Sequence, residues 1–455
     1  MKFWMSGLLF ATCALAQDGK EAPPPLGTPK AFAVPASETF QLKNGMKVTL
    51  AQHGSVPIVA VRAVLAFGNV NETADQVWMS DLLAELMKEG TATMSAQQVA
   101  NEAARMGGQL TIGARSDSSS ASIEVLSEFA PDAVKLIADV LQHPKLPASE
   151  LERLRGNLLR QLSVQLATPQ AQANQVFAAA LYPNHPYGRL YPTEDQLKSY
   201  RIEDVQKYYA ANVGAQRTHL YVVGRFDPAI RKTIETAFES WNAGPPVKRN
   251  PPDSVAKAQS IIVDRPGAVQ STLRIGLPVP LTPVETDYIP LDVTNTLLGG
   301  AFTSRITNNI REQKGYTYSP FGQVATRYRS TYWQESADVT TKFTGDSVRE
   351  ILFEINRLRK DPPDAKELQG VQNFMSGVFV FRNSSNQGII QQLSFVELHG
   401  LSDDYLKTYV QRVNAVSRGD VQRITETYFS PTKMTLVVVG DKSAIQDSLK
   451  PYMKP

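Results

Sequence analysis

The alternation of apolar and polar residues predicts that regular structure begins near Phe40. Residues 40–50 read FQLKNGMKVTL, with apolar and polar positions alternating on both sides of Asn44 and Gly45. A period of two is typical of a half-buried strand, and Asn-Gly is the pair that a type I′ hairpin turn favours. We therefore expect a β-hairpin here, followed by a buried strand in the apolar run at residues 57–67.

The pattern changes to helical spacing at residues 73–89. Apolar residues recur there every three or four positions, and Gly90 follows as a helix stop. Ser95 is a suitable N-cap for the next helix. The remaining expected elements of this half are helices at 95–105, 130–142, 148–166 and 202–211, strand-like sequence at 111–126 and a buried strand at 219–223.

A change of composition divides the chain in two. Residues 243–258 read AGPPVKRNPPDSVAKA, and the density of Pro and Gly favours a linker over a helix or a central strand. After this linker the order of elements repeats, with a strand pair at 261–279 and a helix at 287–298. The ends of the two halves, residues 195–227 and 403–443, also match in pattern.

We therefore predict two homologous α+β domains, each an antiparallel-rich β-sheet packed against helices. The N-terminal domain is expected at residues 37–242 and the C-terminal domain at 259–455, joined by the Pro-rich linker. A repeat of this size excludes a solenoid, whose repeats run to about 20–50 residues.

The first residues have the composition of an export signal. Lys2 precedes the apolar run at 3–15, and Ala14-Leu15-Ala16 forms a small-x-small cleavage site. We expect a cleavable signal peptide at 1–16, a Pro-rich tether at 17–36, and a periplasmic or secreted protein. The apolar run is too short for a membrane anchor, and we expect no integral membrane segment.

Composition and charge exclude several classes of function. The 455 residues are 42% hydrophobic and 20% charged, which allows large cores, and the net charge of +3 is spread along the chain. No basic stripe favours nucleic acid as a partner. Cys13 is the only cysteine and lies in the predicted signal peptide, so the mature chain has no disulfide and no cysteine-based zinc site.

Histidines offer little for a metal site. The five are His53, His143, His185, His219 and His399. No two are close enough in sequence to ligate one metal from adjacent helical turns. Distant histidines could still meet in space, but His219 in an apolar strand and His185 in a Pro-rich loop are better interpreted as structural.

Three phrases carry a resemblance to a known family. They are LLAELMKEGT at residues 82–91, YPNHPYGR at 182–189 and SRITNNIREQKGYTYS at 304–319. Together with the duplicated domain, they resemble the insulinase, pitrilysin and mitochondrial-processing-peptidase family of zinc peptidases. The resemblance extends from about residue 40 to the end of the chain.

The resemblance also shows what has been lost. Active members of that family carry an inverted H-x-x-E-H motif just before a Gly-Thr pair, and its three positions fall here on Asp81, Ala84 and Glu85. The family's third ligand, a glutamate, falls on Gln161 or, with a slip of one residue, on Arg160. The resemblance therefore implies no zinc in this chain and no peptide hydrolysis by the chain alone.

Asp81 and Glu85 lie four residues apart and therefore on one face of the expected helix. Two carboxylates without a third ligand suit at most a weak site for a hard cation, not tetrahedral zinc. A solvated polar face is the better interpretation of the pair. Even a bound metal would lack the carboxylate that Ala84 replaces and that would activate water.

The third phrase keeps the residues that the family uses to reach substrate. The resemblance assigns this role to Arg311 and Tyr318, whose guanidinium and phenol can hydrogen-bond a substrate carbonyl. Gly315 would allow the turn that directs Tyr318 toward Arg311, and Tyr316 is the neighbour that could be mistaken for it. The alternative is an arginine paired with a nearby acid and an aromatic residue that fills core.

The resemblance implies a non-catalytic subunit of a heteromeric zinc metallopeptidase. Such a subunit would help to enclose peptide substrates, while zinc and the H-x-x-E-H motif belong to a homologous partner in a heterodimer. One alternative is a structural or peptide-binding scaffold without a role in proteolysis. Another is an unusual active enzyme that uses Asp81 and Glu85.

Overall fold

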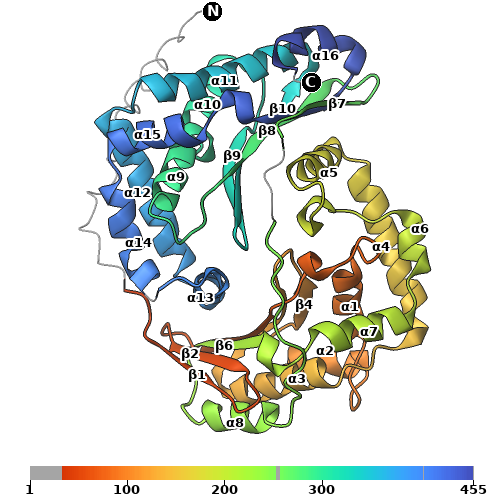
Figure 1. Ribbon diagram of the computed structural model, residues 1–455. Helices are drawn as coiled ribbons and strands as arrows, with labels where there is room; N and C mark the ends of the chain where they lie inside the picture. The colour runs from red at the N-terminus through yellow and green to blue at the C-terminus, as the bar shows by residue number, and fades with distance from the viewer. Residues whose placement is uncertain (1–32, 253–256, 403, 454–455) are drawn as a thin grey trace, which may run out of the picture. The chain divides into compact units, whose positions relative to one another are not determined.

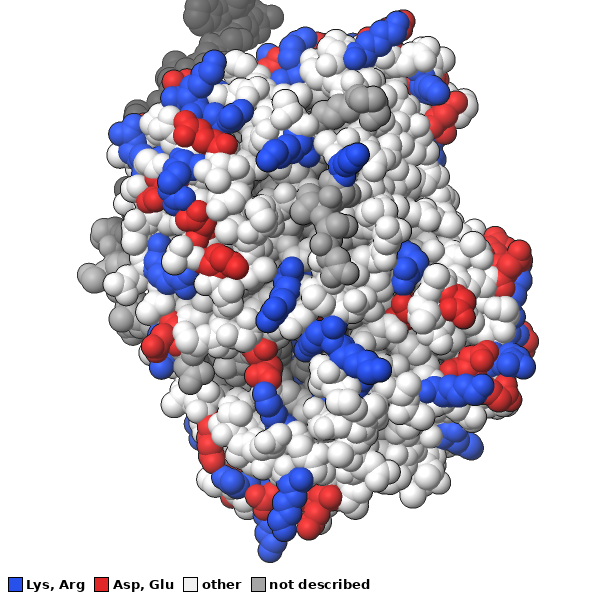
Figure 2. All heavy atoms as spheres, in the orientation of Figure 1, with Lys and Arg blue, Asp and Glu red and all other residues white. Residues whose placement is uncertain are grey.

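The computed structural model describes residues 33–252, 257–402 and 404–453 (Figure 1). The predicted signal peptide at 1–16 and residues 17–32 of the predicted tether lie outside the described residues. Among the helices that are described, none is both long enough and apolar enough to cross a membrane. Figure 2 shows that acidic and basic side chains are mixed over the visible face.

The first half of the chain builds a six-stranded sheet in the order β1-β2-β6-β3-β5-β4. The pair β2 and β6 is parallel, and the other neighbours are antiparallel. The sheet is formed by β1 (Ser37–Gln41), β2 (Lys47–Gln52), β3 (Ile58–Leu65), β4 (Thr111–Ala114), β5 (Ser119–Leu126) and β6 (Thr218–Gly224).

The predicted hairpin is present, but its turn is not type I′. Gln41 pairs with Lys47, which leaves five residues in the loop. Gly45 has a φ of 89°, whereas Asn44 has a negative φ, and a type I′ turn needs a positive φ at both. The Asn44 side chain instead donates hydrogen bonds to the carbonyl oxygens of Phe238 and Trp241 at 2.7 and 3.1 Å. These contacts tie the loop to a distant part of the half.

Helices pack against one face of this sheet and bury a single large core with it. They are α1 (Met79–Met87), α2 (Ala96–Arg105), α3 (Ala130–Gln142), α4 (Leu151–Leu166), α6 (Glu194–Ser199), α7 (Ile202–Asn212) and α8 (Ile230–Phe238), whereas α5 (Pro169–Leu181) of the same half lies outside this core. Ser95 caps α2 as predicted, because its side chain accepts a hydrogen bond from the backbone N–H of Gln98. Gly90, with a φ of 108°, ends the segment that contains α1.

The second half builds a five-stranded sheet in the order β7-β11-β8-β10-β9. Its strands are β7 (Ser260–Asp264), β8 (Gln270–Val279), β9 (Phe321–Arg327), β10 (Ser330–Thr340) and β11 (Thr435–Gly440). Its helices are α9 (Tyr288–Asn295), α10 (Arg305–Thr307), α11 (Thr344–Lys360), α12 (Ala365–Arg382), α13 (Asn386–His399), α14 (Asp404–Ala415), α15 (Arg418–Tyr428) and α16 (Lys442–Leu449).

The two sheets have the same topology, which confirms the predicted duplication. The order β7-β11-β8-β10-β9 repeats β2-β6-β3-β5-β4, including the parallel pair at its start. The expectation that β7 and β8 pair with each other is wrong, because β11 from the far end of the chain lies between them. The described residues of the linker, 243–252 and 257–258, contain neither helix nor strand. The domain boundaries themselves stay a prediction.

Each sheet also receives a helix from the other half. Helix α5 contacts β8 and β11 of the second sheet, and α13 contacts β3 and β6 of the first (Figure 1). Phe177 and Leu181 of α5 belong to one apolar cluster with Val437 and Val439. Ile389 and Ile390 of α13 are buried in another apolar cluster, which includes Tyr221 of β6. The two halves are therefore joined by packed apolar contacts as well as by the linker.

Candidate functional site

Helix α1 carries the motif positions and is a core helix. Its side chains Leu82, Leu83, Leu86 and Met87 are all at most 2% exposed, and the helix contacts β4, α4 and α7. Ala84 is also buried. The packing role expected of this stretch is therefore present, although the helix begins at Met79 and not at residue 73.

Glu72 sets the start of α1. Its carboxylate accepts hydrogen bonds from the backbone N–H groups of Trp78 and Ser80 at 3.0 and 2.8 Å, which satisfies donors at the helix N-terminus. Burial raises the pKa of Glu72 to about 7. The sequence analysis missed this residue, and its only signal was an acid a few residues before an apolar helix.

Asp81 is tied into the same network. The side-chain amide of Asn69 donates to Asp81 at 2.9 Å and to Glu72 at 3.1 Å. Burial raises the pKa of Asp81, and the charge of Glu85 raises it further. The charge of Asp81 in turn adds to the rise in the pKa of Glu72. Asp81 therefore departs from the expected solvated face, since it is half-buried and held by Asn69.

The other two motif positions lie apart from this network. Glu85 forms an ion pair with Lys88 at 2.7 Å, one turn along the helix. Gln161 lies on α4 and is exposed. Helix α4 packs against α1, so the fold does bring the helix that carries Gln161 next to the helix that carries the motif positions. In the part of the chain that the structure describes, no three His, Cys, Asp or Glu side chains form a group that could hold a metal ion.

The two histidines interpreted as structural have fixed partners. His219 Nε2 lies 2.7 Å from Thr49 Oγ1, and its Nδ1 lies 3.1 Å from the Tyr221 hydroxyl. Burial lowers the pKa of His219 to about 4, so the ring is neutral at physiological pH. His185 Nε2 lies 2.7 Å from the carbonyl oxygen of Asn250 in the linker. Both rings act as hydrogen-bonding parts of the scaffold.

Arg311 and Tyr318 lie together on the second half. The guanidinium carbon of Arg311, in the π-helical turn Asn308–Gln313, is 5.1 Å from the Tyr318 ring centre and 4.1 Å from that of Phe302. Gly315 has a φ of 62° and makes the turn between Arg311 and Tyr318. The cation therefore lies within cation–π distance of two aromatic rings.

Exposure separates Tyr318 from its neighbour. Tyr318 is 81% exposed and Phe302 is 68% exposed, so neither fills core. Tyr316 does so instead, half-buried and stacked on Phe343 with ring centres 4.4 Å apart. Arg311 also forms an ion pair with the adjacent Glu312 at 3.2 Å. Phe302 was missed, and its signal was an apolar residue just after the Gly299-Gly300 pair.

The absence of side chains at Gly299 and Gly300 allows two chain segments to approach closely. A Cβ on Gly299 would lie 2.2 Å from a carboxyl oxygen of Glu335 and 3.1 Å from the Cα of Gly322. Glu335 is almost fully buried, and burial raises its pKa well above the usual range. The π-helical turn Thr296–Gly300 therefore packs directly on β9 and β10.

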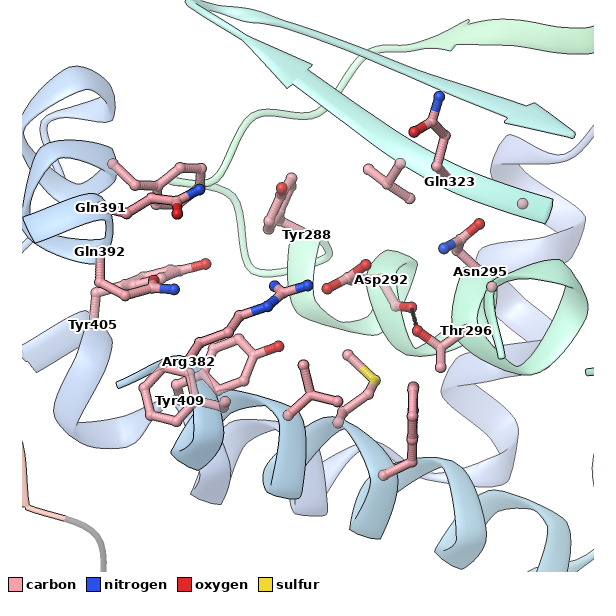
Figure 3. Close-up of a pocket in the computed structure, with 18 of the residues that line it drawn as sticks. Tyr288, Asp292, Asn295, Thr296, Gln323, Arg382, Gln391, Gln392, Tyr405 and Tyr409 are labelled. Atoms are coloured by element: carbon pink, nitrogen blue, oxygen red, sulfur yellow. Dashed lines mark hydrogen bonds between the residues drawn. The ribbon is translucent and has the colours of Figure 1, made fainter. Parts of the chain in front are cut away.

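A cavity of about 540 Å³ opens near this turn (Figure 3). Aromatic side chains from α9 and α14 line it, and Figure 3 shows Arg382 of α12 reaching toward Asp292 of α9. Burial raises the pKa of Asp292 to about 6, opposed by the positive charge of Arg382. The sequence signal for this cavity was Asp292 itself, the only charged residue in the helical stretch 288–298.

Comparisons with known proteins agree on one family. Residues 47–192 match the family model described as insulinase (peptidase family M16), and residues 199–375 match that of the peptidase M16 inactive domain. The chain is 25% identical over 408 residues to an uncharacterized zinc protease, YmxG, of Bacillus subtilis, covering 86% of this chain and 96% of that protein. It is 20% identical to the non-peptidase homolog YmxG of Helicobacter pylori, covering 89% and 94%.

Solved structures show the same fold. A peptidase M16 inactive domain from Pseudomonas fluorescens superposes with a TM-score of 0.81 at 21% identity, covering 89% of this chain and 98% of that one. A protease from Helicobacter pylori superposes with a TM-score of 0.82 at 18% identity, covering 90% and 100%.

Proposed function

Because the chain belongs to the insulinase (M16) family of peptidases, we propose that it is a non-catalytic member that binds peptides beside a catalytic partner. The match to the family's inactive domain and the likeness to a relative named a non-peptidase homolog support the absence of catalysis. Other relatives are named zinc proteases, so the assignment rests on the residues at the motif.

The observation that carries the proposal is the chemistry of α1. The helix keeps its leucine packing, while Asp81, Ala84 and Glu85 stand where two imidazole ligands and a general base are needed. Ala84 is the decisive loss, because its methyl group cannot take a proton from an attacking water at the position where the motif needs a carboxylate. Gln161 adds a neutral amide where a third, anionic ligand is needed.

Arg311 and Tyr318 supply the peptide-binding half of the proposal. The phenol is exposed, and contacts with two aromatic rings restrain the guanidinium, which reduces the entropy lost when it donates to a substrate carbonyl. Phe302 adds exposed apolar surface beside them. The three side chains suit an extended peptide backbone with an apolar side chain.

Catalysis then belongs to a homologue that carries H-x-x-E-H and binds zinc, in a heterodimer with this chain. Co-purification tests the partnership, since a tagged copy should retain such a protein and its zinc. Arg311→Ala should lower the peptide turnover of that complex without changing its assembly. A tagged copy that retains no H-x-x-E-H protein would refute the partnership, and unchanged turnover would remove Arg311 from the site.

The ion pair between Arg311 and Glu312 favours a second candidate, a scaffold in which Arg311 is purely structural. A scaffold should tolerate alanine at both Arg311 and Tyr318 without loss of turnover in any complex it joins. The third candidate, a metal site on Asp81 and Glu85, predicts stoichiometric metal in the purified chain. Metal analysis decides that question.

The signal peptide predicted at residues 1–16 supports a periplasmic or secreted location for the complex. N-terminal sequencing of the exported protein should find Gln17 as the first residue. A mature protein that starts at Met1 would exclude this location.

A further inference from the structure

The first sheet and α13 enclose a cavity with an unusual excess of positive charge. Its volume is about 370 Å³, within the range of small-ligand sites. Its walls come from β2, β3 and β6, from the loop that follows β4, from the linker and from α13. The charged residues that line it are Lys47, Arg62, Arg115, Arg217, Arg249 and Glu397.

Two of the five cations are already used by the fold. Lys47 forms an ion pair with Glu397, the single carboxylate of the lining, at 2.6 Å. Arg217 donates to the carbonyl oxygens of Pro245 and Pro246 at 2.9 and 2.7 Å and so holds the linker. His219 also lines the cavity, but it is neutral because burial depresses its pKa. Arg62, Arg115 and Arg249 are left.

None of these three arginines forms an ion pair within the described part of the chain. Arg62 donates from Nη2 to the Ser120 hydroxyl at 3.2 Å, and its Nε is buried without a hydrogen-bond partner. Arg249 makes a single long hydrogen bond, 3.4 Å to the carbonyl oxygen of Asp117, and its guanidinium carbon lies 5.0 Å from the ring centre of Tyr328. Among the described residues, the side chain of Arg115 has neither an ion pair nor a hydrogen bond. Together the three arginines form a cluster of cations in the lining of the cavity.

The positive charges around the cavity also repel one another. Burial and the charge of Arg115 both lower the pKa of Arg62, and burial and the charge of Arg249 lower that of Arg217. Like charges gathered at a partly buried site are unfavourable, and an anion that accepts from several guanidinium groups removes this penalty. Clefts lined by one sign of charge also concentrate ligands of the opposite sign.

We propose that this cavity, called the arginine cavity below, binds a carboxylate of a peptide, either an acidic side chain or the C-terminus. Guanidinium groups match carboxylate geometry and can bind it through paired hydrogen bonds. Val64, Val247, Phe395 and Leu398 form apolar walls beside the arginines, which suit the rest of a peptide better than a bare inorganic ion. The choice of a peptide rests on the proposed function, whereas the anionic preference rests on the arginine cavity alone.

The test measures binding of four matched hexapeptides to the purified full chain by isothermal titration calorimetry. The peptides have either one internal Glu or one internal Gln, and either a free or an amidated C-terminus. Loss of the contacting carboxylate should weaken binding about tenfold to hundredfold, as expected for hydrogen bonds between charged groups. If Gln in place of Glu lowers the affinity, the contacting carboxylate is the acidic side chain. If amidation lowers it, the contacting carboxylate is the C-terminus.

Three variants connect the binding to the arginine cavity. Arg62→Gln and Arg249→Gln should each weaken binding of the carboxylate peptide at least about tenfold. Arg115→Gln should act in the same direction, and because Arg115 is exposed it keeps the test valid if the Arg62 variant folds poorly. Arg225→Gln is the matched control, since Arg225 is exposed, forms no ion pair within the described chain and lies outside the arginine cavity.

Two results would overturn the proposal. One is that the peptide without a carboxylate binds with the same affinity as the peptides that have one. The other is tight binding of inorganic phosphate with no binding of any peptide, which would assign the arginine cavity to phosphate compounds. The titration uses the chain alone, whereas the partnership and the turnover effect of Arg311→Ala are measured on the complex. A negative titration would therefore not refute the proposed function.

Discussion

The carboxyl group of Glu72 should make the stability of this protein fall as the pH rises. Glu72 is buried at the N-terminus of α1, and its pKa is raised to about 7 from an ordinary value of 4.5. Between these two values the folded state keeps the proton while the unfolded state has lost it. The stabilisation is thus fully present below pH 4.5, declines as the pH rises, and is lost above about pH 7.

The size of this loss of stability follows from the difference between the folded and unfolded pKa values of Glu72. This difference spans about 2.5 pH units, and each unit corresponds to about 1.4 kcal/mol, so the full loss is about 3.5 kcal/mol. Glu72→Gln cannot titrate. It also loses one of the acceptors that bind the N–H groups of Trp78 and Ser80, at a cost of about 1–3 kcal/mol that does not depend on pH.

The assay is urea unfolding followed by tryptophan fluorescence at several pH values from 5 to 8. The stability advantage of the natural chain over Glu72→Gln should shrink by about 2.5 kcal/mol across this range, because part of the effect is already lost at pH 5. Glu85→Gln removes a half-exposed carboxylate from the same helix and should give a difference that stays within about 0.5 kcal/mol throughout. A constant difference between the natural chain and Glu72→Gln would refute the reasoning.

Two further predictions concern the scaffold around the site. Below pH 6.5 the unfolded His219 binds a proton, whereas the folded one, with its pKa at about 4, does not. The stability of the natural chain should therefore decline by about 3 kcal/mol as the pH falls toward 4, and His219→Asn should remove this decline. Unfolding at pH 7 and pH 5 measures this, and an unchanged pH dependence in the variant contradicts it. Leu83→Ala should lower the free energy of unfolding by about 2–5 kcal/mol, because Leu83 is fully buried in α1. Glu85→Ala on the same helix should change it by less than about 0.5 kcal/mol, and equal effects of the two would argue against a core role for α1.

Local pattern was sufficient to predict most elements of the fold, and non-local contacts account for the errors. The Asn-Gly pair located the hairpin, but Asn44 binds the carbonyl of Phe238, nearly two hundred residues away, and this changes the turn. Apolar spacing located α1, but the carboxylate of Glu72 decides where the helix starts. The neighbours of β7 were misjudged because β11 enters the sheet from the end of the chain.

The candidate site was predicted only where its residues are close together in sequence. Arg311, Gly315 and Tyr318 lie within one phrase, and the turn at Gly315 brings the pair together. Phe302 completes the arrangement from a preceding turn, which no spacing rule indicates. The arginine cavity combines β3, two loops and α13, so its charge excess becomes visible only once the two halves are packed together.

Peptide hydrolysis by the purified chain, with and without added zinc and chelator, tests the central claim most directly. The loss of ligands and general base at Asp81, Ala84, Glu85 and Gln161 predicts no hydrolysis by the chain alone under either condition. It predicts chelator-sensitive hydrolysis once an H-x-x-E-H partner is added. Chelator-sensitive hydrolysis by the chain alone, abolished by Asp81→Asn, would contradict the claim and restore α1 as a metal helix.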